Sequence, residues 1–159
     1  ALTRTLRLAA EISDGLPAEY EPGGLIKERL ERCLDQWESE AARRHLTIVR
    51  RIEKNIPHAL VPLGGFESVL DELYGGAIAR APRGTVIVAA ADAATDGKLA
   101  VSVQDASVGA PDRAPGALES LAFALSRELV ERWGGKLETA VTAYGRGRRA
   151  TLFLTAKKS

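Results

Sequence analysis

The sequence predicts an α/β (α+β) two-layer sandwich, a mostly antiparallel mixed sheet covered on one face by about three helices. Two features lead to this fold class. Apolar residues recur at helical spacing in segments 25–44, 66–84 and 117–133. Between and after them lie short β-branched or alternating runs, which turn residues separate. Helical and extended segments mixed in this way are typical of helices packed on a sheet.

Length and composition fit one ordinary domain. The chain has 159 residues, of which 45% are hydrophobic and 27% charged, close to the globular average. Its apolar runs are too short to span a bilayer, and 22 basic against 21 acidic residues give a net charge of +1. We therefore expect no nucleic-acid partner and no membrane contact from this fragment.

The first half of the chain is predicted to alternate helical and extended segments. Residues 1–18 form a linker or the end of a preceding helix, and a connector over 19–24 leads to a helix over 25–44. The apolar stripe of this helix consists of Ile26, Leu30, Cys33, Leu34, Trp37 and Ala41. A strand begins at His45. Prolines flank the extended piece 56–62 and are expected to confine it to a sheet edge.

The helix expected over 66–84 is the element on which a functional site would be built. Its apolar stripe consists of Phe66, Val69, Leu70, Leu73 and Ala77. Gly75 and Gly76 interrupt this helix, although each glycine costs about 1 kcal/mol relative to alanine in a helix interior. Either another element packs closely against these glycines, or side chains that once mattered there have been lost.

The second half of the chain combines strands with one helix. Asp96-Gly97 is a hairpin signal between two strands. After a loop rich in Gly, Pro and Ala, a helix over 117–133 ends at Gly134. The strands are expected over residues 85–91, 99–105, 136–142 and 149–155.

Few side chains could carry chemistry when residue types alone are considered. The chain has no HExxH, CxxC, P-loop or GxSxG pattern, so metalloprotease, zinc and serine hydrolase functions have no support. Glu72 lies mid-helix, and Asp105 ends a strand before a loop that contains Gly109. Such a carboxylate is suited to binding the edge of a small ligand. The alternative is that Asp105 caps a turn and Glu72 is solvated.

The remaining candidate residues can be explained without a functional role. The single cysteine, Cys33, is expected to be a small buried hydrophobe rather than a reactive thiol. His45 and His58 are expected to be structural. The arginines within 146–149 form either a solvated hairpin tip or a contact for an acidic partner or nucleic acid, although no aromatic platform accompanies them.

Four segments, taken in order, carry a family resemblance: VLDELYGGAIARAPRG, VSVQDASVG, LESLAFALSRELVERWGGKLE and GRGRRATLFLTA. Over residues 19–159 they resemble the Asn-bearing helix, the two glycine boxes and the closing turn of the catalytic and ATP-binding domain of sensor histidine kinases, in the GHKL ATPase group. The resemblance implies a Bergerat-type fold, with residues 1–18 as the linker from a dimerisation segment.

The resemblance also implies a setting for the domain. It implies ATP and magnesium as cofactors, a cytoplasmic location and a homodimeric parent. The implied partners are a response regulator receiver domain or a partner kinase, and an upstream dimerisation and histidine hairpin of the same chain.

Two positions on the central helix bear on catalysis and metal binding. Gly76 stands where the family has the asparagine that coordinates magnesium, and a hydrogen atom cannot replace an amide oxygen in that shell. Glu72, one turn earlier, matches the position of a residue that orients water or substrate, and it is the catalytic candidate. No metal-ligand residue is predicted.

Besides Gly76, the cofactor-binding candidates are Asp105, Ser107, Gly109, Ser120, Ala122 and Arg148. Asp105 matches the aspartate that accepts the adenine amino proton, and Ser107 replaces the first glycine after it. Ser120 and Ala122 replace glycines that let backbone N–H groups approach the phosphates. Arg148 stands where a threonine is usual.

These departures favour a degenerate domain with weak or absent ATP binding, which acts as a signalling or interaction module. One alternative is an active, divergent histidine kinase domain that binds ATP with magnesium and phosphorylates a histidine on a separate hairpin. Another is the docking domain of a histidine phosphotransferase-like protein. Whether the pocket beside Asp105 and Gly76 is open, or is filled by Tyr74, Ala122 and Phe123, bears on this choice.

Overall fold

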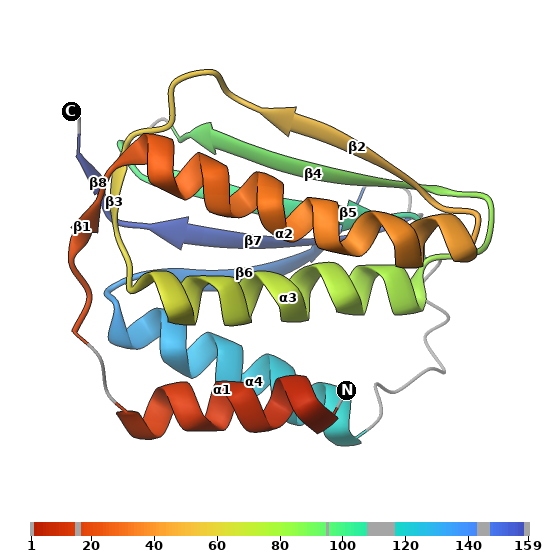
Figure 1. Ribbon diagram of the computed structural model, residues 1–159, viewed down its shortest axis with the longest axis horizontal. Helices are drawn as coiled ribbons and strands as arrows, with labels where there is room; N and C mark the ends of the chain where they lie inside the picture. The colour runs from red at the N-terminus through yellow and green to blue at the C-terminus, as the bar shows by residue number, and fades with distance from the viewer. Residues whose placement is uncertain (1, 15–16, 95, 108–116, 143–146, 158–159) are drawn as a thin grey trace.

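The predicted class, helices on one face of a mixed sheet, is confirmed by the structure (Figure 1). The computed structural model describes residues 2–14, 17–94, 96–107, 117–142 and 147–157. The helices within these ranges are α1 (Leu2–Asp14), α2 (Gly23–Arg43), α3 (Leu63–Arg80) and α4 (Ala117–Arg132). Helices were expected at all of these places, with boundaries that differ by a few residues.

The main sheet has the strand order β2-β4-β5-β7-β6. Its strands are β2 (Thr47–Ile52), β4 (Val86–Ala93), β5 (Leu99–Asp105), β6 (Lys136–Val141) and β7 (Arg148–Leu154). β2 pairs parallel with β4, and the other neighbours are antiparallel. The β4-β5 hairpin turns at Gly97, whose φ of 81° is in the left-handed region that favours glycine. The hairpin predicted from Asp96-Gly97 is confirmed.

A second, small sheet corrects one prediction. It has the order β1-β3-β8 and consists of β1 (Tyr20–Glu21), β3 (His58–Leu60) and β8 (Ala156–Lys157). β3 lies between two antiparallel partners, so the expectation that prolines confine 56–62 to a sheet edge is wrong. Pro57 and Pro62 flank the strand without entering it, which leaves the N–H of Leu60 free to bond the carbonyl of Thr155 at 2.8 Å.

The core lies between the helices and the main sheet. On β5, burial alternates along the strand, and the buried positions are Leu99, Val101, Val103 and Asp105. Because successive side chains of a strand point to opposite faces, Asp105 points to the same face as the core residues. α3 supplies much of the opposing surface, including the fully buried Phe66 and Leu70.

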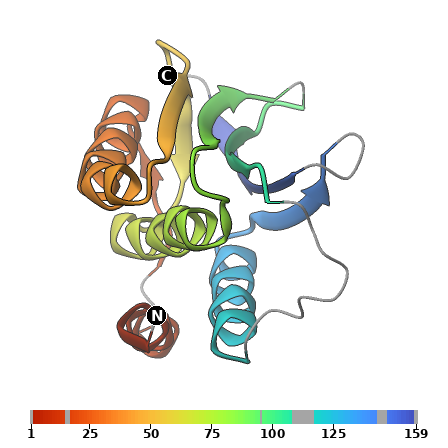
Figure 2. The same cartoon turned by 90° about the vertical axis from the view of Figure 1, so that its right-hand side faces the viewer.

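α1 packs against α3 and α4, on the side of the helices away from the sheet (Figure 2). Leu8 is fully buried there, whereas Leu6 is 61% exposed. Arg7 donates to the carboxylate of Asp71 on α3 at 2.9 Å. The division of the chain at residue 18 stays a prediction.

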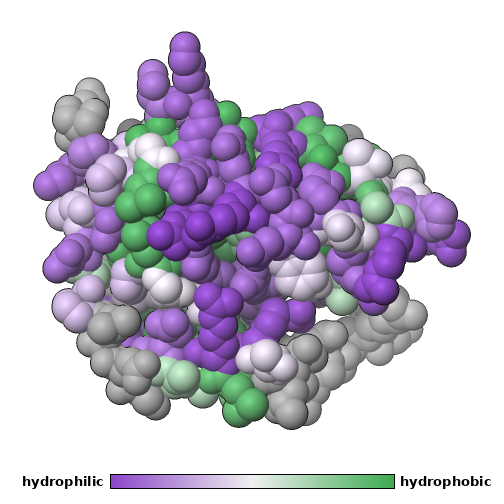
Figure 3. Space-filling model, in the orientation of Figure 1, coloured by the Kyte–Doolittle hydropathy of each residue, from purple (hydrophilic) through white to green (hydrophobic). Residues whose placement is uncertain are grey.

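The surface seen from the side of α2 and α3 is mainly hydrophilic (Figure 3). This fits the amphipathic pattern of α2, whose charged residues face outward. Among the described residues, no helix has both the length and the apolar character that crossing a bilayer requires.

Candidate functional site

A cavity of about 650 Å³ opens beside the C-terminal half of α3. α4, β6 and β7 form its other walls, and α1 and α2 each contribute side chains. The lining residues used below are Glu72, Gly76, Arg80, Phe123, Arg127 and Arg148. Glu72, Gly76 and Arg80 follow one another at intervals of four, so they share one face of α3. The cavity is of the size that small-molecule sites usually have.

Asp105 lies beneath this cavity rather than in its wall. Its side chain is 2% exposed, and Asp105 is not among the lining residues. Its Oδ2 accepts a hydrogen bond from Arg80 Nη2 at 3.3 Å, and its Oδ1 accepts one from the backbone N–H of Ser107 at 2.8 Å. Both carboxylate oxygens therefore already have partners within the protein.

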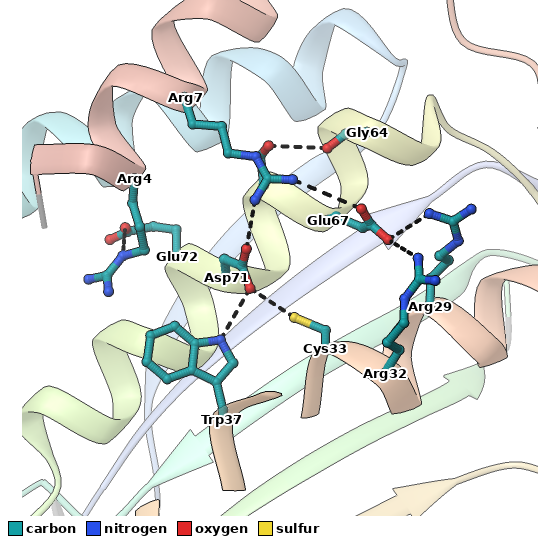
Figure 4. Close-up of polar contacts among 11 residues, drawn as sticks. Arg4, Arg7, Arg29, Arg32, Cys33, Trp37, Gly64, Glu67, Asp71 and Glu72 are labelled. Carbon is teal, nitrogen blue, oxygen red and sulfur yellow. Dashed lines mark hydrogen bonds and ion pairs between the residues drawn. The ribbon is translucent and has the colours of Figure 1, made fainter. Parts of the chain in front are cut away.

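Glu72 lines the cavity and is only 8% exposed, so the alternative that it is solvated is wrong. Arg4 of α1 donates from Nε to Glu72 Oε2 at 3.2 Å (Figure 4). The guanidinium of Arg4 also lies 5.6 Å from the centroid of the Trp37 ring. An arginine of α1 is thus paired with Glu72, the predicted catalytic residue.

The two adjacent glycines of α3 differ in their surroundings. A Cβ on Gly75 would lie 2.6 Å from Arg4 Nη1 and 2.8 Å from Trp37 Cη2, so close packing explains this glycine. A Cβ on Gly76 would meet only the end of the Arg80 side chain, at 3.0 Å. Gly76 lines the cavity and leaves space there.

The remaining predicted site residues are spread over several elements. Ser107 follows β5 and is partly exposed, whereas Gly109 lies outside the described residues. Ser120 and Ala122 lie inside α4, and Ala122 is 3% exposed. Only the first four N–H groups of a helix lack helical partners. Ser120 is the fourth residue of α4 and Ala122 is the sixth. Of these two residues, only Ser120 is therefore at a position whose N–H has no partner within the helix.

Arg148 lines the cavity, and the adjacent Arg149 is exposed. The other arginine of this predicted cluster, Arg146, lies outside the described residues. Of the side chains expected to fill the pocket, Phe123 contributes to its wall, while Tyr74 is buried elsewhere. Burial raises the pKa of the Tyr74 phenol above its ordinary value.

Cys33 and His45 have structural surroundings. Cys33 is 5% exposed, which confirms that it is buried, and its thiol donates to Asp71 Oδ1 at 3.0 Å. His45 follows α2 with a φ of 56°. Its N–H bonds the carbonyl of Ala42, and the N–H of Leu46 bonds that of Ala41, as in a common helix-ending motif.

Sequence reasoning missed Arg4, Arg80 and Arg127, all of which line the cavity. Arg80 could have been found from its helical spacing to Glu72 and Gly76. Arg4 could not, because it is 68 residues from its partner Glu72. Within the described ranges, no group of three or more His, Cys, Asp and Glu side chains could hold a metal ion.

The arrangement of helices on a mixed sheet is shared with solved structures of histidine kinases, among them an isolated catalytic domain. Full-length ShkA in complex with AMPPNP matches with a TM-score of 0.77 and 18% identity, over 98% of this chain and 35% of that chain. The cytoplasmic segment of the histidine kinase QseC matches at 0.73 and 12%, over 99% of this chain and 93% of that chain. The nucleotide-free catalytic domain of the histidine kinase ThkA matches at 0.73 and 14%, over 91% of this chain and 100% of that chain.

At these identities the comparison shows a shared fold. The sequence itself matches no family model and no curated protein. The predicted similarity to histidine kinase catalytic domains therefore holds in three dimensions. The chain spans about a third of the length of ShkA, at 35%.

Proposed function

We propose that this chain is a histidine-kinase-like ATP-binding domain with a degenerate nucleotide pocket, which binds ATP weakly or not at all and acts as a signalling or interaction module. The observation that carries the proposal is that the Asp105 carboxylate already accepts hydrogen bonds from within the protein. Arg80 and the Ser107 N–H occupy both oxygens of the carboxylate that the family resemblance assigns to adenine. An adenine amino group would have to compete with the Arg80 guanidinium for this carboxylate, and separating Arg80 from the buried Asp105 side chain is costly.

The metal end of the pocket supports the same proposal. Position 76 offers no side-chain oxygen to a magnesium ion, and Glu72 is already paired with Arg4. The described residues do not fit ATP with magnesium. Without these groups, most of the electrostatic stabilisation on which phosphoryl transfer depends is absent.

The wider setting follows from the kinase fold as part of the proposal. The parent protein would be a cytoplasmic homodimer in a two-component system. This domain would contact a response regulator receiver domain, a partner kinase, or the dimerisation and histidine hairpin upstream of it. In each case the module contributes a surface rather than phosphoryl transfer.

Calorimetric titration with AMPPNP, in magnesium and separately in excess EDTA, tests the proposal. We expect binding weaker than about 1 mM in magnesium, and no gain in affinity over EDTA. Arg80→Ala, which releases Asp105, should bind AMPPNP more tightly than the original chain does. Micromolar binding by the original chain that disappears in EDTA would overturn the proposal.

An active, divergent kinase domain is the second candidate, because the cavity is open and Glu72 lies in its wall. Phosphorylation of a histidine hairpin supplied in trans, with radiolabelled ATP, would establish it. Loss of that activity in Glu72→Gln, with the fold intact by circular dichroism, would assign the catalytic role to Glu72.

A further inference from the structure

The described wall of the cavity has a surplus of positive charge. It includes the arginines Arg4, Arg44, Arg80, Arg127 and Arg148, and its only carboxylates are Glu40 and Glu72. Five positive and two negative side chains give this wall a net charge of +3, or +2 when Asp105, the buried partner of Arg80, is counted, although the whole chain carries only +1. A cleft lined by one sign of charge concentrates ligands of the opposite sign.

Three of these arginines have carboxylate partners. Arg4 pairs with Glu72 at 3.2 Å, Arg80 with Asp105 at 3.3 Å, and Arg44 with Glu40 at 3.1 Å. These pairs are built into the fold, so they leave little charge for a ligand.

Arg127 and Arg148 differ from the other three. Neither makes an ion pair or a side-chain hydrogen bond with any residue that the structure describes. Arg127 projects from α4 and Arg148 from β7, on two different walls of the same cavity. Two guanidinium groups that pair with no carboxylate of the described residues, and that lie on different walls of one cavity, can each donate paired hydrogen bonds to a phosphate, sulfonate or carboxylate.

Aromatic and aliphatic side chains lie beside these arginines. The guanidinium of Arg127 stacks 5.0 Å from the centroid of the Phe123 ring. Trp37, Ile78 and Val141 add apolar wall. A cavity of about 650 Å³ with such walls and a few polar groups is typical of a site for a small organic molecule.

We propose that this cavity binds a ring-bearing organic anion that carries a single sulfonate, carboxylate or phosphate group rather than a triphosphate, without a divalent metal, and with Arg127 and Arg148 as the anion-binding residues. The proposal names a ligand class for the site and rests on the proposed loss of magnesium-dependent ATP binding. A divalent cation would be repelled by the surplus of arginines, and these arginines already supply the charge that a metal would bring.

The probe for this test is 8-anilinonaphthalene-1-sulfonate, whose naphthalene and phenyl rings carry one sulfonate. Its fluorescence is followed during titration in excess EDTA and without nucleotide. Arg127→Gln and Arg148→Gln each remove one proposed contact. The matched control is Arg149→Gln, which makes the same charge change one residue along β7, where the side chain points to the other face of the sheet.

We expect saturable binding whose dissociation constant rises at least about tenfold in Arg127→Gln and in Arg148→Gln, but changes less than about twofold in Arg149→Gln. N-phenyl-1-naphthylamine has the same rings without the sulfonate, and its affinity should not respond to either cavity substitution. Circular dichroism and urea unfolding check that each variant is folded. The charge-reversal variant Arg148→Glu, which should abolish binding of the sulfonate, provides a second variant at that position.

Absence of saturable binding in EDTA would overturn this inference, as would equal effects of Arg148→Gln and Arg149→Gln. Neither result bears on AMPPNP and magnesium, so the proposed function would stand. Conversely, magnesium-dependent AMPPNP binding would overturn the proposed function, while the sulfonate titration in EDTA would still decide the role of Arg127 and Arg148.

Discussion

At the scale of single residues, the adjacent glycines of α3 should respond in opposite ways to alanine. Gly76→Ala should raise the free energy of unfolding by about 0.5–1 kcal/mol, because alanine favours the helix and only the flexible end of Arg80 must shift. Gly75→Ala should give no such gain, because its Cβ would collide with Arg4 and with the ring of Trp37. Urea unfolding of both variants measures this. Equal stabilisation would show that close packing at Gly75 has no energetic weight.

The Arg80–Asp105 pair should show a measurable coupling energy. Asp105 is 2% exposed, so removing Arg80 leaves a buried carboxylate with one fewer partner. Since Arg80 is itself about one-third exposed, at 32%, we expect a coupling of about 1–2 kcal/mol in a double-mutant cycle of Arg80→Ala and Asp105→Asn.

The exposed pair Arg132–Glu128 is the matched control, with side chains 48% and 53% exposed. Its coupling should be about 0.5 kcal/mol or less. If the two cycles gave the same coupling, Arg80 would not be held by Asp105, and the carboxylate that the family resemblance assigns to adenine would be available.

At the scale of elements, α1 should behave as part of the cooperative fold. Leu8→Ala should lower the free energy of unfolding by about 2–5 kcal/mol, because Leu8 is fully buried against the helix layer. Leu6→Ala lies on the same helix at a 61% exposed position and should change it by less than about 0.5 kcal/mol. Urea unfolding of both variants tests this. Similar small effects would mean that α1 is a linker that rests on the domain without stabilising it.

The contact between α2 and α3 should make stability depend on acid pH. Burial alone would raise the pKa of Glu67, but hydrogen bonds and charge from Arg29 and Arg32 hold it below its ordinary 4.5 (Figure 4). A lowered folded-state pKa stabilises the fold above the unfolded value and loses that contribution as pH falls from about 4.5 through the folded pKa.

Glu67→Gln should therefore flatten the fall in urea midpoint between about pH 6 and pH 3. Because Glu67 is partly exposed, the change should not exceed about 1 kcal/mol. Glu131→Gln, at an exposed position of α4, is the control. An identical pH profile for Glu67→Gln and the original chain would contradict the assignment.

At the scale of the whole molecule, the sequence predicts what local periodicity determines. The stripes of α2 and α3, the alternation of β5 and the turn at Gly97 all depend on spacings of a few residues, and all were predicted. The two-residue strands β1 and β8 are too short to show a pattern, which is why the central position of β3 was missed. The pairs Arg80–Asp105 and Arg4–Glu72 depend on how distant elements meet. The cavity was therefore expected with Arg148, but without Arg4, Arg80 and Arg127.

Cys33 should report the opening of the whole fold. It is 5% exposed between α2 and α3, and burial, with the hydrogen bond and charge of Asp71, raises its pKa above the ordinary value. Thiolate is the reactive form, so labelling by Ellman's reagent should require unfolding. Its rate should therefore increase with urea as steeply as the population of unfolded chains does.

Two leucines calibrate this reporter. Leu30→Ala removes a side chain that is 1% exposed, and its expected cost of about 2–5 kcal/mol should accelerate labelling by roughly 30-fold to several thousandfold. Leu121→Ala, at a position 49% exposed, should leave the rate unchanged. If labelling were fast in native buffer and Leu30→Ala did not change its rate, α2 and α3 would separate locally at Cys33. The helix layer would then open independently of the sheet, and the walls of the cavity could move apart without unfolding.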